Sequence, residues 1–124
     1  MGKQLTVRRT SLVGLIPLLL FLMIGESAAH ALLDRAEPRV GNQVAAPPHE
    51  VTLWFTQKLE QAFSTITVTN AGGQRVDTGK TRVSGSQMSV AVRPGGTGTY
   101  HVTWRVLSAD SHTTDGSFTF QVGQ

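Results

Sequence analysis

Apolar residues recur at every second position in several short segments of the chain after residue 30. Because successive side chains of a strand point to opposite faces, such a segment offers one face to a core and one to solvent. Turn-forming residues separate the segments. The segments are 51–55, 66–68, 88–92, 100–106 and 118–122, and the turns include 70–73, 84–86 and 93–96. The pattern predicts an all-β protein, an immunoglobulin-like β-sandwich of about seven strands.

The prolines define the first part of this sandwich. We expect the first strand at residues 31–36, ending at Glu37-Pro38. Pro47-Pro48 cannot lie in a central strand, so residues 38–48 are predicted to be a connection, followed by a strand at 50–56 and a short helical turn or loop at 57–63. The chain has no cysteine, so no disulfide joins the sheets and the fold depends on packing alone.

The first 29 residues have the order of a secretory signal peptide. Lys3, Arg8 and Arg9 precede an apolar run at 12–24, and small residues follow at 25–29. The run is shorter than the roughly 20 residues that a membrane helix needs. Cleavage after Ala29 or after Ala31 fits the small-residue rule. The residues around Arg8-Arg9 resemble a twin-arginine signal, and both this route and ordinary secretion stay open.

Export changes the charge that matters. The whole chain has a net charge of +3, but residues 30–124 carry eight basic and seven acidic residues, a net charge of +1. These residues contain no arginine cluster and no basic patch with interleaved aromatic side chains. A nucleic-acid partner is therefore not expected, and residues 30–124 are predicted to form one soluble domain.

Common catalytic motifs are absent from the sequence. There is no thiol nucleophile, no Gly-x-Ser-x-Gly elbow and no glycine-rich phosphate loop. His101 lies in a predicted strand on the face opposite Tyr100, and His49 follows two prolines, so both are interpreted as surface residues. Met88 alternates with valines and is interpreted as part of the core.

The segment Ser108-Ala109-Asp110-Ser111-His112 offers two metal ligands. In an extended chain Asp110 and His112 would project to the same side. If the mature chain begins at His30, its α-amine and ring nitrogen could chelate the same ion. An amine, two imidazoles and a carboxylate form the tetragonal N,O set that suits Cu(II), whereas Cu(I) prefers sulfur ligands. We predict one Cu(II) ion bound by His30, Asp110 and His112.

These segments resemble the CopC family of periplasmic copper-binding proteins. The resemblance covers residues 30–122. It includes His-Ala-Leu-Leu at 30–33, Val-Thr-Leu-Trp-Phe at 51–55, Gly-Thr-Tyr-His-Val-Thr-Trp-Arg-Val at 98–106, and Ser-Ala-Asp-Ser-His at 108–112. It implies a Greek-key sandwich, cleavage after Ala29, Cu(II) binding by the N-terminal histidine with the Asp and His of the last segment, and a CopD-type inner-membrane partner.

The sequence departs from some family members at two places. The stretch 70–86 has no methionine, which speaks against a second site for Cu(I), and Gln57 stands near a position where some relatives have glutamate. We predict a periplasmic monomer that sequesters or delivers copper in copper resistance or homeostasis and has no enzymatic turnover. The alternatives are a copper-dependent oxidative enzyme resembling lytic polysaccharide monooxygenases, or a sandwich that binds only proteins.

Overall fold

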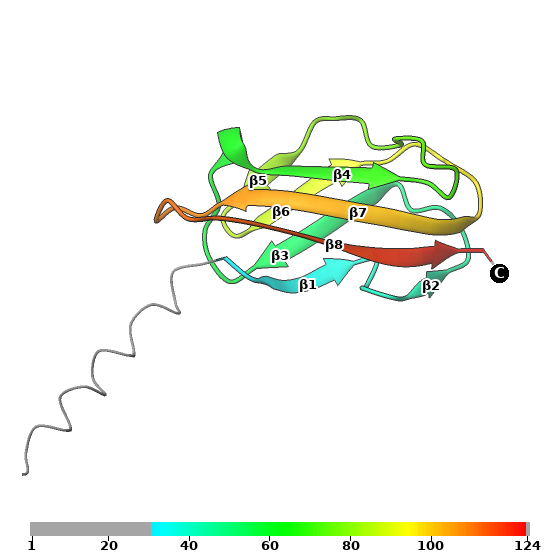
Figure 1. Cartoon of the computed structure of the whole chain (residues 1–124), viewed down its shortest axis with the longest axis horizontal. Coiled ribbons are helices and arrows are strands. Elements are labelled where there is room, and N and C mark those ends of the chain that lie inside the picture. Colours follow the sequence, from blue (N-terminus) through cyan, green and yellow to red (C-terminus); the bar gives the residue numbers. More distant parts are fainter. Residues whose placement is uncertain (1–30, 124) are drawn as a thin grey trace, which may run out of the picture.

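The computed structural model describes residues 31–123, which form a two-layer β-sandwich (Figure 1). No helix in this range is long and apolar enough to cross a membrane. The predicted leader, residues 1–29, and His30 lie outside the described residues. The elements are β1 (Leu33–Glu37), β2 (Gln43–Val44), β3 (Glu50–Phe55), the 3₁₀ turn η2 (Gln61–Phe63), β4 (Thr65–Thr69), β5 (Arg82–Ser84), β6 (Gln87–Ala91), β7 (Gly98–Leu107) and β8 (Thr113–Val122).

Each layer is a four-stranded sheet. Sheet A has the order β1-β3-β6-β5, and sheet B has the order β2-β8-β7-β4. From β3 onward the chain crosses from sheet A to sheet B at β4, returns to sheet A for β5 and β6, and crosses again to sheet B for β7 and β8. These crossings produce the Greek-key arrangement of an immunoglobulin-like domain. Strands β7 and β8 form a long antiparallel hairpin that runs the length of sheet B.

The all-β prediction is confirmed, and residues 31–123 form eight strands where about seven were expected. Most strand positions agree with the predicted segments, but β2 and β5 were missed. The expected connection at 38–48 contains β2, whose two residues pair in parallel with Gln121 and Val122 of β8. Strands of two or three residues are too short to show an alternating pattern, so pairing with a neighbour defines them.

An aromatic contact joins the two sheets through the core. The rings of Phe55 on β3 and Trp104 on β7 meet edge to face, with centroids 5.0 Å apart. In antibody domains a disulfide connects the two sheets, and here aromatic packing takes its place. Gly116, directly opposite Trp104 on β8, leaves room for the indole ring. Met88 is fully buried, as the sequence predicted.

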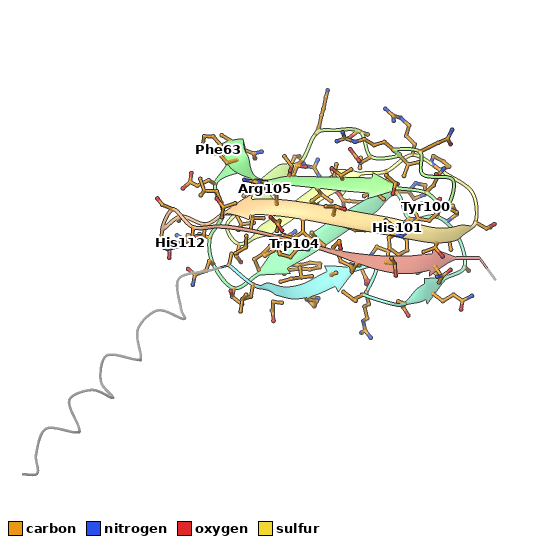
Figure 2. The ribbon with its side chains drawn as sticks, in the orientation of Figure 1. Phe63, Tyr100, His101, Trp104, Arg105 and His112 are labelled. Carbon is orange, nitrogen blue, oxygen red and sulfur yellow. The ribbon has the colours of Figure 1, made fainter. Side chains whose placement is uncertain are left out.

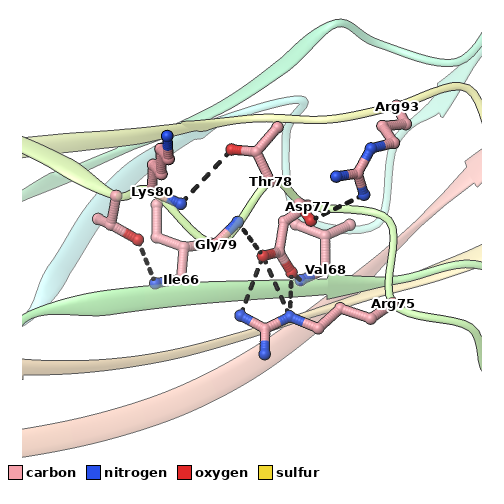
Figure 3. Close-up of polar contacts among 9 residues, drawn as sticks. Ile66, Val68, Arg75, Asp77, Thr78, Gly79, Lys80 and Arg93 are labelled. Atoms are coloured by element: carbon pink, nitrogen blue, oxygen red, sulfur yellow. Dashed lines mark hydrogen bonds and ion pairs between the residues drawn. The ribbon is translucent and has the colours of Figure 1, made fainter.

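Side chains close the free edge of β4 (Figure 3). The buried Asp77 carboxylate accepts hydrogen bonds from the backbone nitrogens of Val68 and Gly79, at 2.8 Å each, and from the Arg75 guanidinium. The Thr81 hydroxyl accepts from Ile66 N at 3.0 Å. An open sheet edge is a template for pairing with other chains, and these acceptors occupy the N–H groups of Ile66 and Val68 on β4.

Replacing Gly116 with alanine tests the aromatic contact. A Cβ atom at this position would lie 2.5 Å from Trp104 Cζ2, so the ring must move away from Phe55. We expect the free energy of unfolding to fall by about 1–3 kcal/mol in chemical denaturation. Gly72→Ala is the matched control, because a Cβ atom there meets its nearest neighbour at an ordinary 3.6 Å. Equal stability of the two variants would contradict this role for Gly116.

Replacing Asp77 with asparagine tests the closed edge. Burial raises the pKa of Asp77, but hydrogen bonds from Arg75, Val68 and Gly79 outweigh it, and the net pKa lies below the usual value. Because the folded-state pKa is lowered, this stabilisation is fully present above the ordinary value of about 3.9 and is lost as pH falls from there through the lower folded-state pKa. We expect Asp77→Asn to lower the free energy of unfolding by about 1–3 kcal/mol at neutral pH. The free energy of unfolding should also depend less on pH in the acid range, as denaturation at several pH values would measure.

Asp34, an exposed residue of β1, provides the control for this measurement. Asp34→Asn should leave the free energy of unfolding at neutral pH close to that of the unmodified protein, because the residue is exposed. An Asp77→Asn protein that loses stability in acid as steeply as the original would show that other carboxylates dominate.

Candidate metal centre

Asp110 and His112 lie together in the turn between β7 and β8, at one end of the sandwich (Figure 2). His112 Nδ1 is 3.3 Å from Asp110 Oδ1, and each side chain is nearly half exposed. The structure therefore brings these two predicted ligands into contact at the surface, where an ion could reach both.

The turn brings them together by a different route from the one predicted. The sequence argument assumed an extended chain, but β7 ends at Leu107 and residues 108–112 form a tight turn with Ser111 at φ 76°. Ser111 N donates to Ser108 O at 2.8 Å, and Ser108 N donates to His112 O at 2.9 Å. Asp110 and His112 therefore come together because the chain turns back on itself, and not because alternate side chains of a strand point to the same side.

Ser108 connects the backbone of this turn with its ligands. Its side chain is fully buried, and its hydroxyl donates to Asp110 Oδ1 and accepts from His112 N at 3.3 Å. The hydrogen bond from Ser108, followed by the contact with His112, lowers the pKa of Asp110 and keeps it a carboxylate. An ionised carboxylate at the surface is suited to binding a cation.

The first described residues lie beside this turn. Ala31 is fully buried, and its carbonyl oxygen accepts a 2.9 Å hydrogen bond from the hydroxyl of Thr114, two residues after His112. The first described residue is therefore anchored to β8. His30 itself lies outside the described residues, and its role as a ligand stays a prediction.

The segment after β3 supports both parts of the candidate centre. Thr56 N donates to Leu32 O at 3.0 Å, and Lys58 O accepts from Ala109 N at 2.9 Å. Gln57, half-buried between these two contacts, makes interactions of its own. Sequence reasoning missed Thr56, Lys58 and Thr114, because nothing in their spacing shows that they meet residues far away in the chain.

The other candidate ligands lie elsewhere. His101 is exposed on the outer face of sheet B and pairs in register with Thr69 and Thr119, as expected for an outward-facing residue. His49 is exposed immediately before β3. Met88, the one methionine in the described range, is inaccessible to an ion. No group of three His, Asp or Glu side chains gathers within residues 31–123, so Asp110 and His112 form a pair that needs further ligands.

Comparisons with known proteins agree on one family. The CopC domain model matches residues 33–123. The copper transport protein CutJ of Bacillus subtilis is 32% identical over 115 residues, which are 88% of this chain and 21% of that protein. The structure of CopC from Methylosinus trichosporium OB3b matches with a TM-score of 0.70 at 30% identity and covers 75% of this chain and 93% of the other. The structure of PcoC, a methionine-rich copper resistance protein from Escherichia coli, matches with a TM-score of 0.65 at 31% identity. The match covers 76% of this chain and 99% of PcoC.

Replacing Ser108 with alanine tests the geometry of the turn without any metal. The largest cause that lowers the pKa of Asp110 is the hydrogen bond from Ser108, so its removal should move this pKa upward toward the ordinary value of about 3.9. An NMR pH titration of the Asp110 carboxyl group would measure the change. Ser117→Ala, on an exposed position of β8, is the control. An unchanged titration midpoint in Ser108→Ala would show that the hydroxyl does not act on this carboxylate.

Proposed function

The chain belongs to the CopC family, and from this premise we propose that it is an exported protein that binds one Cu(II) ion through His30, Asp110 and His112. In this proposal signal peptidase cuts after Ala29. The new α-amine and the His30 ring then occupy two positions around the ion, and the Asp110 carboxylate and the His112 ring occupy two more.

One observation carries the proposal: the beginning of the described chain is attached to the hairpin that bears the other two ligands. The bond from Thr114 to Ala31 O places the N-terminal segment of sheet A beside the turn of sheet B. Asp110 and His112 already contact one another in that turn. These contacts support a site in which three ligand residues from two distant parts of the sequence surround one ion.

The chemistry of these donors favours Cu(II). Three nitrogens and one carboxylate oxygen suit a tetragonal cupric site, and Cu(II) stands above Zn(II) in the general order of divalent-metal affinities. An α-amine has a pKa near 7.7–8.0, so a strongly bound cation displaces its proton at neutral pH. A site for Cu(I) would need accessible sulfur, and the sulfur of Met88 is buried.

We assign the protein a role in sequestering or delivering copper outside the cytoplasm, with the periplasm as its location. The matched part of CutJ is about a fifth of that longer copper transport protein, which supports transfer of the ion to a transport partner of the CopD type. Copper is the cargo in this role, so the nearly half-exposed ligands are an advantage because a partner can reach them.

Adding one alanine ahead of His30 in the mature protein tests the amine ligand. The extension turns the α-amine into an amide but keeps every side chain, so any loss of affinity comes from the terminus. Changes in residues that only support metal ligands cost about 10–100-fold in affinity, and we expect loss of a direct ligand to raise the Kd for Cu(II) by more than about 100-fold. Competition titration would give the Kd, and electron paramagnetic resonance would show the altered ligand set.

Three side-chain variants complete this test. His30→Ala and His112→Ala should each weaken Cu(II) binding steeply, whereas His49→Ala should not, because His49 lies outside the proposed centre. Equal affinity of the extended and unextended proteins would exclude the N-terminal chelate. Peroxide-dependent oxidation of a polysaccharide by the copper-loaded protein would contradict a role in binding alone.

A further inference from the structure

Two threonine hydroxyls hold one peptide group from opposite sides. The group joins Ala31 to Leu32. Its carbonyl oxygen accepts a hydrogen bond from Thr114 Oγ1 at 2.9 Å, and its N–H donates to Thr56 Oγ1 at 3.0 Å. In a trans peptide the C=O and N–H point in opposite directions, so the two hydroxyls must come from opposite sides. We call this pair, Thr56 and Thr114, the threonine clamp.

The clamp joins the two sheets at the end of the sandwich that bears Asp110 and His112. Thr56 follows the last residue of β3 in sheet A, and Thr114 is the second residue of β8 in sheet B. Thr56 also binds Leu32 through the backbone, with Thr56 N donating to Leu32 O at 3.0 Å. Any shift of the N-terminal segment along or away from the hairpin must therefore break a hydrogen bond to one sheet.

Apolar packing contributes little at residues 31 and 32, before Leu33 packs against the core. Ala31 is buried but contributes only a methyl group, and the side chain of Leu32 is 60% exposed. Chain termini are usually poorly ordered unless specific contacts hold them. At this position the contacts are polar, and side-chain hydroxyls that lie far apart in the sequence supply two of them.

We propose that Thr114, together with Thr56, is a positioning residue for the copper site. This inference rests on the proposed function. The clamp fixes the peptide group that follows Ala31, one residue after the proposed ligand His30, and in this proposal it limits how far the α-amine can move from the Asp110–His112 pair. A chelate depends on ligands held to within about 0.5 Å, and a terminus ordered before the ion arrives loses less conformational entropy on binding.

The experiment compares Thr114→Val with Thr114→Ser in the mature protein that begins at His30. Valine keeps the shape of threonine but removes the hydroxyl, whereas serine keeps the hydroxyl. Thr103→Val is the matched control, an exposed threonine of the same hairpin on strand β7. Each protein is measured for the Kd of Cu(II), the electron paramagnetic resonance spectrum, the denaturation midpoint, and the amide exchange of Leu32 without metal.

We expect Thr114→Val to raise the Kd for Cu(II) about 10–100-fold, as for other groups that orient metal ligands. Its resonance spectrum should broaden or split, because the amine no longer has one position, and its Leu32 amide should exchange faster. Thr114→Ser should restore the affinity and the spectrum, and Thr103→Val should match the unmodified protein. Thr56→Val should weaken binding in the same direction.

Three results would count against the inference, and they can be distinguished. If Thr114→Val speeds the exchange of Leu32 but keeps the original Kd and spectrum, the clamp is structural only and the proposed function stands. If the unmodified protein binds Cu(II) no more tightly than the form with an added N-terminal alanine, the proposed function fails and the positioning role fails with it. A drop in denaturation midpoint that serine reverses without restoring affinity would also count against the clamp.

Discussion

The edge-to-face contact between Phe55 and Trp104 sets the spacing between the two sheets, and the rest of the structure depends on that spacing. Without cysteine, no covalent bond joins the layers, so the aromatic pair and the surrounding buried side chains must do so. Gly116 makes the contact possible because it leaves the space that the indole ring needs. Phe55 is also the last residue of β3, so the same contact fixes where Thr56 meets the N-terminal segment.

The candidate metal centre lies where these two layers meet at the surface. One part is the turn between β7 and β8, whose shape Ser108 holds from its buried position by contacting both Asp110 and His112. The other part is the N-terminal segment, held between Thr56 and Thr114. Neither part could bind an ion tightly alone, because each offers only two donors in the proposed set. In the proposed function, the position of the N-terminal segment relative to the turn therefore decides the affinity for the ion.

Much of this molecule could be predicted from local pattern. Period-two alternation and the positions of the prolines located most of the strands, and the residue types at 30, 110 and 112 are enough to suggest copper. The two short strands β2 and β5 were not predicted, because their identity depends on hydrogen bonds to partners elsewhere. The approach of Asp110 to His112 was expected from an extended chain, but it results from a turn with Ser111 in a left-handed conformation.

The sequence by itself determined the fold class, the absence of a disulfide and the kinds of donor available to an ion, because alternation, cysteine count and residue chemistry are properties of the chain alone. Only the tertiary structure decided that Ala31 contacts Thr114 and that Ser108 is buried within the turn that bears Asp110 and His112. The same holds for the Asp77 carboxylate, which covers the free edge of β4. These contacts join residues up to 83 positions apart. Their formation depends on how two sheets pack, and no local pattern records that.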